Sequence, residues 1–247
     1  MVAGCGRLQF DPLEQTDART GNGGDSGDAM AASLCPNISV QLCDGFESPT
    51  LDSAWLLDQA RGTVSLDTTR AFRGGSSLHL HTEAIGAGVF AIATVRHSGF
   101  GTINGVAHAR AWVYLASPYP LTSFDQLVNF AGLDGLGVSM GTRMGGIYSN
   151  DYRFLQSAQS STVPIPDQWI CIELHTPSGV PGGDVRVFLD GVEVLAAKVP
   201  VAMTNTHPSP DHIYFGLDWV NNANALPAVD VWIDEVIVDS APTSCAQ

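Results

Sequence analysis

The stretch Gln168–Thr176 shows most clearly how this chain alternates between apolar and other positions. The apolar row consists of Ile170, Ile172 and Leu174. The intervening positions carry an indole, a sulfur, an acid and an imidazole: Trp169, Cys171, Glu173 and His175. Because successive side chains of a strand leave opposite faces, this pattern predicts a strand with its apolar face in the core. The other face, with its aromatic, acidic and imidazole groups, is expected to lie outside.

Similar segments, separated by turn residues, follow one another from Cys35 onward. Short runs rich in β-branched and aromatic residues and bounded by Gly, Pro, Asn or Asp are typical of strands. The predicted strands are Ile38–Leu42, Gly62–Asp67, Ser76–Thr82, Val89–Arg96, Val106–Ala116, Gln126–Leu133, Leu136–Thr142, Tyr152–Gln156, Gln168–Thr176, Asp184–Leu189, Val192–Ala196, His212–Val220 and Val229–Val238. No long segment has helical periodicity, although Leu51–Gln59 fits a short turn of helix.

Two Asp-Gly pairs mark sharp reversals between predicted strands. Asp190-Gly191 is the stronger signal, because Asp-Gly is favoured in the tight turns of antiparallel hairpins. Asp134-Gly135 separates a second pair of predicted strands. With many short strands, 26 Gly and 14 Pro, the chain is expected to be all-β, either a sandwich or a barrel. The absence of an internal repeat argues against a propeller or a solenoid.

Composition and charge narrow the classes of partner. A length of 247 residues with 45% hydrophobic residues fits one large β domain with a substantial core. The net charge of −14 argues against nucleic acid, since neutralising phosphates requires basic patches. It also disfavours electrostatic docking on anionic lipid. No apolar run approaches the roughly 20 residues of a membrane-spanning helix.

Residues 1–34 differ in composition from the rest of the chain. They are rich in Gly, Asp, Ala, Thr and Ser and lack periodicity, so they are expected to be a disordered tether before a folded domain over residues 35–247. Val2-Ala3-Gly4-Cys5 resembles the site at which bacterial lipoproteins are lipidated on cysteine, here Cys5. The basic and apolar regions of a signal peptide do not precede it, and the alternative is a free thiol in a tail. We therefore expect an outer-membrane lipoprotein, held to the membrane only by its lipid, or a secreted protein.

The other four cysteines are even in number, as expected in an oxidising compartment. They are Cys35, Cys43, Cys171 and Cys245, and they permit three pairings. If the first and last strands run antiparallel with Phe46 near Asp234, the same register places Cys35 opposite Cys245. We therefore expect Cys35–Cys245 and Cys43–Cys171. Zinc binding is the alternative, but no Cys-x-x-Cys spacing supports it.

Two groups of motifs at opposite ends of the domain resemble a known superfamily. They comprise the opening Gly45-Phe46-Glu47, an Arg73-Gly74-Gly75-Ser76-Ser77-Leu78 strand, the Trp169-Ile170-Cys171-Ile172-Glu173 strand, the Asp-Gly hairpin and the acid-rich Asp230–Glu235. This order resembles concanavalin A-like jelly-roll domains, most closely the secreted bacterial polysaccharide-lyase-like and laminin-G-like ones. The resemblance covers about Cys35 to Cys245. It implies a two-sheet antiparallel β-sandwich, a jelly roll, whose concave face cradles a glycan.

The resemblance also implies a structural calcium ion held by the opening acid and by an acid of the last strand. Here these residues are Glu47 and Asp234. The alternation of the last strand supports this independently, because the apolar positions change parity near Asp234-Glu235, as a β-bulge would cause. A bulged carboxylate beside backbone carbonyls suits a cation that prefers oxygen ligands. The alternative is an acid on an edge strand that faces water.

The non-core faces of several strands carry residues suited to sugar recognition. If those strands lie in one sheet, its outer face collects Arg110, Tyr114, Trp169, Glu173, His175, Tyr214 and Asp218. Aromatic rings beside fixed hydrogen-bonding groups are what a sugar site requires. Alternatively, Trp112 and Tyr114 are core residues and a loop covers the alanine row of their strand.

These residues support three hypotheses about function. The first is a surface-anchored or secreted protein that binds carbohydrate without catalysis. The second is a divergent polysaccharide lyase for uronate glycans, in which Arg110 neutralises the carboxylate, His175 is the base and Tyr114 or Tyr214 is the acid. The familiar motifs of alginate lyases are absent from the sequence. The third is a structural or adhesive module of the cell envelope whose partner is a protein.

Overall fold

The structure is a computed structural model that describes residues 32–35, 38–121, 123–199 and 206–245. Within these ranges the chain forms fifteen strands. They are β1 (Leu42–Asp44), β2 (Trp55–Ala60), β3 (Gly62–Asp67), β4 (Ser77–Thr82), β5 (Phe90–Ser98), β6 (Gly105–Leu115), β7 (Phe124–Ala131), β8 (Gly137–Arg143), β9 (Gly146–Asp151), β10 (Gln156–Gln159), β11 (Trp169–Ser178), β12 (Gly183–Leu189), β13 (Val192–Val199), β14 (His212–Asn221) and β15 (Val229–Asp239). In this part of the chain no helix is long and apolar enough to span a membrane.

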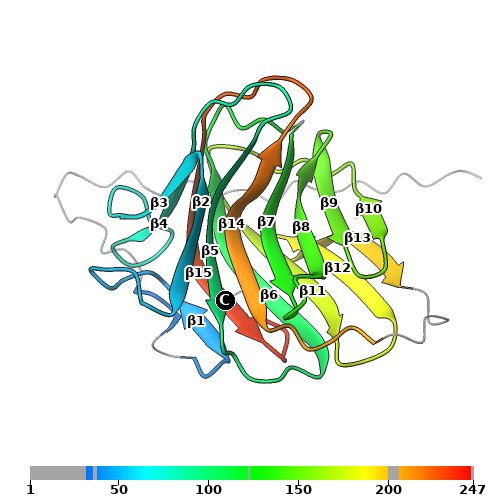
Figure 1. The fold of residues 1–247 in the computed structure, drawn as a ribbon. Coiled ribbons are helices and arrows are strands. Elements are labelled where there is room, and N and C mark those ends of the chain that lie inside the picture. The colour runs from blue at the N-terminus through cyan, green and yellow to red at the C-terminus, as the bar shows by residue number, and fades with distance from the viewer. Residues whose placement is uncertain (1–31, 36–37, 122, 200–205, 246–247) are drawn as a thin grey trace, which may run out of the picture.

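The strands form two antiparallel sheets that pack face to face (Figure 1). One has eight strands, in the order β13-β12-β11-β6-β15-β4-β3, with β1 also paired to β15. The other has seven strands, in the order β10-β9-β8-β7-β14-β5-β2. The predicted fold class, an all-β two-sheet sandwich, is therefore confirmed.

The predicted hairpin at Asp190-Gly191 is confirmed. It joins β12 to β13, and its two residues have φ angles of 48° and 79°. A two-residue turn with positive φ at both positions matches the right-handed twist of the flanking strands, and this explains the Asp-Gly pair. Asp134-Gly135 likewise lies in the connection between β7 and β8.

Several segments differ from their predicted structure. Ile38–Leu42, predicted as a strand, is a strand only from Leu42, where β1 begins, and β9 was not predicted. Leu51–Gln59, expected to contain a turn of helix, instead has a turn at Asp52, whose side chain accepts a hydrogen bond from Ala54 N, and then enters β2. Pairing with β5 decides the conformation here, since tertiary context overrides weak local propensity. Tyr152–Gln156, predicted as a strand, is a turn up to Leu155 between β9 and β10, and Asp151 accepts hydrogen bonds from Arg153 N and Phe154 N.

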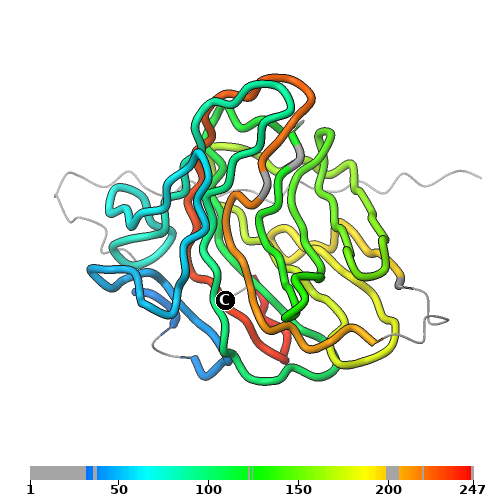
Figure 2. Tube along the Cα trace, in the orientation of Figure 1, coloured from blue at the N-terminus to red at the C-terminus, as the bar shows by residue number. Residues whose placement is uncertain are grey.

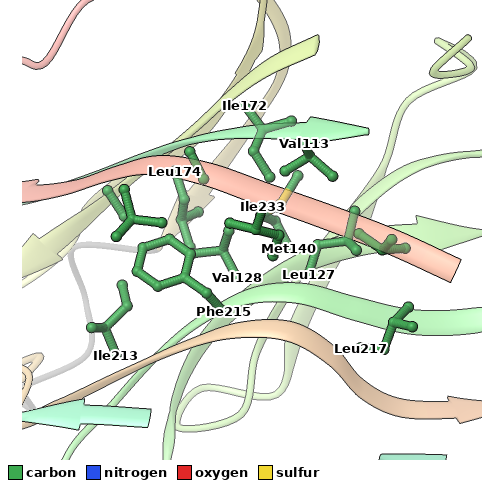
Figure 3. Close-up of a cluster of buried hydrophobic side chains, with 14 of the residues drawn as sticks. Val113, Leu127, Val128, Met140, Ile172, Leu174, Ile213, Phe215, Leu217 and Ile233 are labelled. Atoms are coloured by element: carbon green, nitrogen blue, oxygen red, sulfur yellow. The ribbon is translucent and has the colours of Figure 1, made fainter. Parts of the chain in front are cut away.

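The core lies between the inner faces of the two sheets (Figure 3). From the eight-stranded sheet, Ile172, Leu174 and Ile233 meet Phe215 and Met140 of the seven-stranded sheet, and all are buried. The apolar row predicted on β11 thus faces the core. Burying one such side chain contributes about 1.5–3 kcal/mol relative to leaving it in water.

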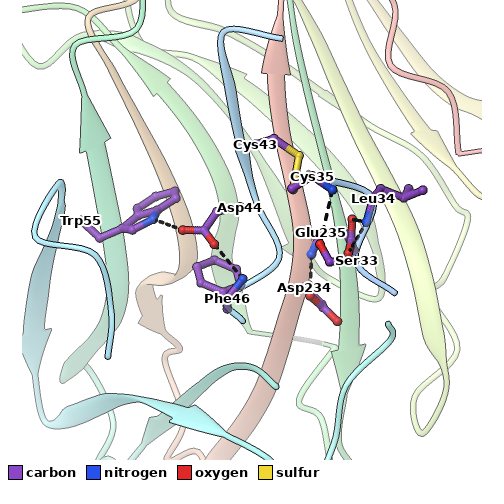
Figure 4. The surroundings of a disulfide bond; sticks show 9 residues. All are labelled: Ser33, Leu34, Cys35, Cys43, Asp44, Phe46, Trp55, Asp234 and Glu235. Carbon is purple, nitrogen blue, oxygen red and sulfur yellow. Dashed lines mark hydrogen bonds between the residues drawn. A yellow bond between two sulfur atoms is a disulfide. The ribbon is translucent and has the colours of Figure 1, made fainter. Parts of the chain in front are cut away.

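The predicted antiparallel register between the first and last strands is confirmed, but the disulfide pairing inferred from it is wrong. β1 pairs with β15 as expected, with Cys43 opposite Ile237. The pairing does not extend back to Cys35, because the preceding segment turns so that Cys35 bonds Cys43 (Figure 4). Cys245 lies over β11 and bonds Cys171.

The chain connections after β4 and β14 lie side by side at the top of the molecule in Figure 2. Ile85 and Leu226 form an isolated antiparallel bridge between them, and Gly88 N donates to Asn222 O. The Ile85–Leu226 bridge continues the pairing of β4 with β15, and the two connections lead side by side from one sheet to the other.

Candidate functional site

The seven predicted binding residues are divided between the two sheets. Arg110, Tyr114, Trp169, Glu173 and His175 lie on β6 and β11 of the eight-stranded sheet. Tyr214 and Asp218 lie on β14 of the other sheet. The inner faces of the sheets meet in the core, so these two groups face opposite sides of the molecule. The expectation that they converge on one face is wrong.

On the eight-stranded sheet, the pairing of β11 with β6 aligns the predicted residues in pairs. Glu173 lies opposite Arg110, and Trp169 lies opposite Tyr114. The Tyr114 and Trp169 rings meet edge to face with centroids 5.7 Å apart. Directly opposed residues of antiparallel strands share a face, and this explains the alignment.

Arg110 and Glu173 hold the C-terminal segment against the sheet. Arg110 Nη1 donates to the carbonyl oxygen of Ser244 at 2.7 Å, and Cys245 N donates to Glu173 Oε1 at 3.1 Å. Both side chains are buried, and the Cys171–Cys245 disulfide fixes the same segment. This segment closes both groups off from a large ligand.

His175 completes this polar corner. Its Nε2 lies 3.0 Å from Glu173 Oε2, and His108 packs edge to face on its ring. Burial, and then the neighbouring His175, lower the pKa of His108 to about 4. His108 is therefore neutral at physiological pH and packs against the hydrogen-bonded His175–Glu173 pair.

A loop covers the aromatic part of the same face. Arg70 lies between two rings, with its Cζ 3.8 Å from the centroid of Tyr114 and 4.1 Å from that of Trp232. Phe72 stacks on Trp112 with centroids 3.7 Å apart. The alternative placement of Trp112 and Tyr114 in the core is therefore wrong, because the alanine row of β6 faces the core and the loop covers the aromatic row.

The outer face of the seven-stranded sheet carries the other two predicted residues among polar neighbours. Tyr214 lies opposite Arg96 of β5 on one side and Asn129 of β7 on the other. Asp218 lies opposite Gln126 of β7, after a register shift that follows Phe215. β14 thus places an aromatic ring and a carboxylate between strands that supply a guanidinium and two amides.

Two of these polar groups have unused hydrogen-bonding capacity. The buried oxygens Gln126 Oε1 and Asn129 Oδ1 have no hydrogen-bond partner within the part of the chain that the structure describes. The other end of the Gln126 amide is fixed, because its Nε2 donates to the hydroxyl of Tyr152 at 2.8 Å. Buried acceptors without partners are costly, so a bound water or a small shift of either amide would be favoured here.

Asp218 is held partly desolvated in this face. Burial raises its pKa to about 6, and the nearby charge of Asp58 adds to the increase, while a hydrogen bond from Asn129 opposes it. A carboxyl group that changes protonation state near neutral pH is typical of functional sites.

Sequence reasoning missed four contributors to this face: Asp58, Arg96, Gln126 and Asn129. The alternation within the β5 segment Ala91–Arg96 places Thr94 and Arg96 opposite the apolar row. That signal identifies Arg96 as outward-facing. No signal in the sequence shows that β5 and β7 flank β14, because strand order depends on long-range pairing.

The two residues expected to bind calcium contact the same loop. Asp234 Oδ2 accepts hydrogen bonds from Phe72 N and Arg73 N, and Glu47 Oε2 accepts one from Gly75 N. Between them, Gly74 has a φ of 67°, and a Cβ there would lie 1.9 Å from Glu47 Oε1. The predicted bulge is confirmed, because the register of β15 with β6 shifts after Asp234 and Glu235 has a φ of 50°.

Burial raises the pKa of Asp234 to about 7, against the lowering effect of its backbone hydrogen bonds. A divalent cation at this point would reduce the cost of the buried negative charge. The two carboxylates are oxygen donors of the kind that calcium prefers, and Gly74 lets the loop approach Glu47 closely.

No protein-family model matches the chain, and no curated protein matches it.

Several solved structures share the fold. "Cellulose induced protein, Cip1" aligns with a TM-score of 0.66 at 18% identity, over 83% of this chain and 100% of that one. A sialidase aligns with a TM-score of 0.56 at 13% identity, over 83% of this chain and 19% of that one. A botulinum neurotoxin type C structure aligns with a TM-score of 0.50 at 11% identity, over 77% of this chain and 44% of that one. At these identities the likeness shows a common β-sandwich fold and nothing finer.

Proposed function

We propose that this protein is a β-sandwich module that binds carbohydrate without catalysis, with the glycan lying across β5, β14 and β7 on the outer face of the seven-stranded sheet. The observation that carries the proposal is the position of Tyr214, between Arg96 and Asn129 on the two neighbouring strands. An aromatic ring offers a stacking surface for the apolar face of a sugar, and the flanking groups bind its hydroxyls.

The polar groups of this face favour a polyhydroxyl ligand over an apolar one. Asp218 would accept hydrogen bonds from sugar hydroxyls when ionised, beside the amides of Gln126 and Asn129. A protein or lipid surface without such donors would leave these groups unsatisfied.

The charge of the chain indicates which glycans bind. With 25 acidic and 11 basic residues, the protein repels polyanions at long range, and the neighbouring acids Asp58 and Asp218 add negative charge to this face. We therefore expect neutral glycans to bind more tightly than uronate polymers.

The structures with the same fold lend general support. The toxin type C structure concerns cell entry that depends on two ganglioside molecules, and another of the structures is a sialidase. The lyase alternative gains no support, because Arg110 is covered by the C-terminal segment and Tyr214 lies on the other side of the sandwich.

The test is a glycan array followed by affinity measurements on the best neutral oligosaccharide. Tyr214→Ala and Arg96→Ala are expected to weaken binding about tenfold or more, since each removes a contact worth about 1–2 kcal/mol. Trp169→Ala is the matched control, because it removes an aromatic ring from the opposite outer face. Unchanged affinity in Tyr214→Ala, or equal loss in Trp169→Ala, would contradict the proposed face. Formation of unsaturated uronate products would contradict the non-catalytic role.

We further propose that Cys5 is lipidated and that the module acts at the outer surface of the cell envelope. Cys5 and most of the predicted tether lie outside the described residues. Two disulfides within the domain are consistent with an oxidising compartment. Metabolic labelling with a fatty acid, lost in Cys5→Ser, would test the anchor.

Calcium binding by Glu47 and Asp234 is also a proposal. In it the ion ties the opening segment of the domain to the last strand through the loop Phe72–Gly75. The shared contacts of both carboxylates with that loop support it.

A further inference from the structure

Three side chains on the outer face of the eight-stranded sheet converge on one point, away from the proposed glycan face. His79 Nε2 lies 2.8 Å from Asp230 Oδ1, and His81 Nδ1 lies 2.8 Å from the same oxygen. One carboxylate oxygen thus receives two imidazole nitrogens at once.

The strand geometry produces this convergence. His79 and His81 are two residues apart on β4, so their side chains leave the same face. Asp230 of β15 lies directly opposite His81, and Trp232 lies opposite His79. All three polar groups therefore stand on regular, paired strands, and this positions ligands more firmly than a loop does.

The cluster is accessible and has an indole beside it. The side chains of His79, His81 and Asp230 are 25%, 34% and 37% exposed. The Trp232 ring stacks on His79 with centroids 4.4 Å apart, and its Nε1 donates to Asp67 Oδ2 at 2.7 Å. The indole holds one imidazole in place while the other side of the cluster stays open to solvent.

We propose that His79, His81 and Asp230 form a binding site for a late first-row divalent metal ion, Zn²⁺ or Cu²⁺. Neutral imidazole nitrogens with one carboxylate oxygen are the donors that these ions prefer. The ring centroids of His79 and His81 lie 6.4 Å apart, so the rings would have to rotate toward each other to share an ion. Three protein ligands leave at least one position for water or for a donor group of a partner molecule.

The alternative to metal binding is that the cluster is only a pair of hydrogen bonds that link β4 to β15. In that case the imidazoles donate to Asp230 and metal affinity does not exceed that of any isolated surface histidine. His212 provides an internal comparison, because its Nδ1 lies 2.8 Å from Asp211 Oδ2 without a second imidazole. The two hypotheses therefore predict different metal affinities for variants of this cluster and of His212.

The experiment is a titration of the folded chain with CuCl₂ and with ZnCl₂ near neutral pH, followed by calorimetry and tryptophan fluorescence. The expected result is one site of highest affinity, with Cu²⁺ tighter than Zn²⁺. His79→Ala, His81→Ala and Asp230→Asn are each expected to weaken it about tenfold or more, whereas His212→Ala leaves it unchanged. Bound Cu²⁺ should quench the fluorescence of Trp232, the indole stacked on His79.

Trp232→Phe tests whether the fluorescence quenching comes from Trp232, because it removes the indole and keeps the three proposed metal ligands. It should remove most of the quenching while the calorimetric affinity persists. Circular dichroism confirms that each variant is folded. Equal metal affinity in the wild type, His79→Ala and His81→Ala, or a loss of affinity in His212→Ala of the same size, would overturn the proposal.

Discussion

At the scale of single residues, Asp218 links the stability of the protein to its proposed binding face. Its carboxyl group is partly buried on β14 and hydrogen-bonded by Asn129, and its pKa is raised to about 6. A carboxyl whose pKa is raised in the native state binds its proton more tightly there than in the unfolded chain. Its contribution to stability is therefore greatest at acid pH.

We predict that Asp218→Asn flattens the dependence of stability on pH. Between the unfolded pKa of about 3.9 and the native value of about 6, the native wild type holds more protons than the unfolded chain. Its stability should therefore fall as pH rises through this window, by about 1–3 kcal/mol for this residue. The variant lacks the group and should lose less stability over the same range.

Melting temperatures of both proteins from about pH 4 to pH 8 check this prediction. Asp125 has a similarly raised pKa and is unchanged in the variant, so only the difference between the two curves is interpreted. Parallel curves would show that Asp218 titrates at its ordinary pKa.

Single residues were identifiable from the sequence where strand alternation alone decides their placement. Tyr214 and Asp218 were expected on the polar face of their strand, and the structure places them there. Arg110 and Glu173 were expected to be open to ligand, and the C-terminal segment covers them. Alternation predicts the face of a side chain but not what packs over that face.

At the scale of elements, β11 is the strand on which the C-terminal segment is fastened. The Cys171–Cys245 disulfide spans a sequence separation of 74, whereas Cys35–Cys43 spans 8. A bridge that closes a longer loop restricts the unfolded chain more strongly. The two disulfides are therefore unequal in their effect on stability.

We predict that the double variant Cys171→Ala/Cys245→Ala loses more stability than Cys35→Ala/Cys43→Ala. Loop entropy gives about 4.5 kcal/mol for the longer bridge and about 2.5 kcal/mol for the shorter one. Release of the segment would also expose Arg110 and Glu173 and increase the difference. Urea unfolding followed by fluorescence measures both values, and a larger loss in the Cys35/Cys43 variant would contradict the prediction.

Elements were predictable from the sequence where local pattern and pairing agree. The bulge in β15 was visible as a change of parity at Asp234-Glu235, and the β12–β13 hairpin was visible as Asp-Gly. β2 was missed because Leu51–Gln59 has no strand alternation, and its pairing with β5 decides its conformation.

At the scale of the whole molecule, the proposed calcium ion would join parts of the chain that are far apart in sequence. Glu47 follows β1, Phe72–Gly75 lies between β3 and β4, and Asp234 belongs to β15. An ion bound only by the folded state stabilises it by mass action.

We predict that EDTA lowers the melting temperature by about 5–10 °C, corresponding to about 3 kcal/mol of lost binding energy. Added Ca²⁺, but not Zn²⁺, should restore it, which separates this site from the His79 cluster. Glu47→Gln should abolish the response, whereas Glu83→Gln, at another exposed acid, should keep it. The same melting temperature with Ca²⁺ and with EDTA would show that the two carboxylates bind no structural ion.

The fold class was predictable because many strands with alternating faces can bury their apolar rows only against another sheet. The assignment of strands to sheets was not. β6 and β14 have the same alternating pattern, yet they lie in opposite layers. The sheet to which each strand belongs depends on pairing between distant segments. For this reason Tyr114 and Tyr214 lie on different sheets.

The passage from β2 to β3 through the single residue Arg61, which has a φ of 54°, shapes how the molecule meets its neighbours. β2 and β3 are the outermost strands of the two sheets on the same flank. On the opposite flank, β10 and β13 contact each other. An exposed edge strand has unpaired backbone groups with which a strand of another chain can pair, and this can start a fibril. Here the edge strand of each sheet contacts the edge strand of the other sheet, and this contact is expected to disfavour the addition of another chain.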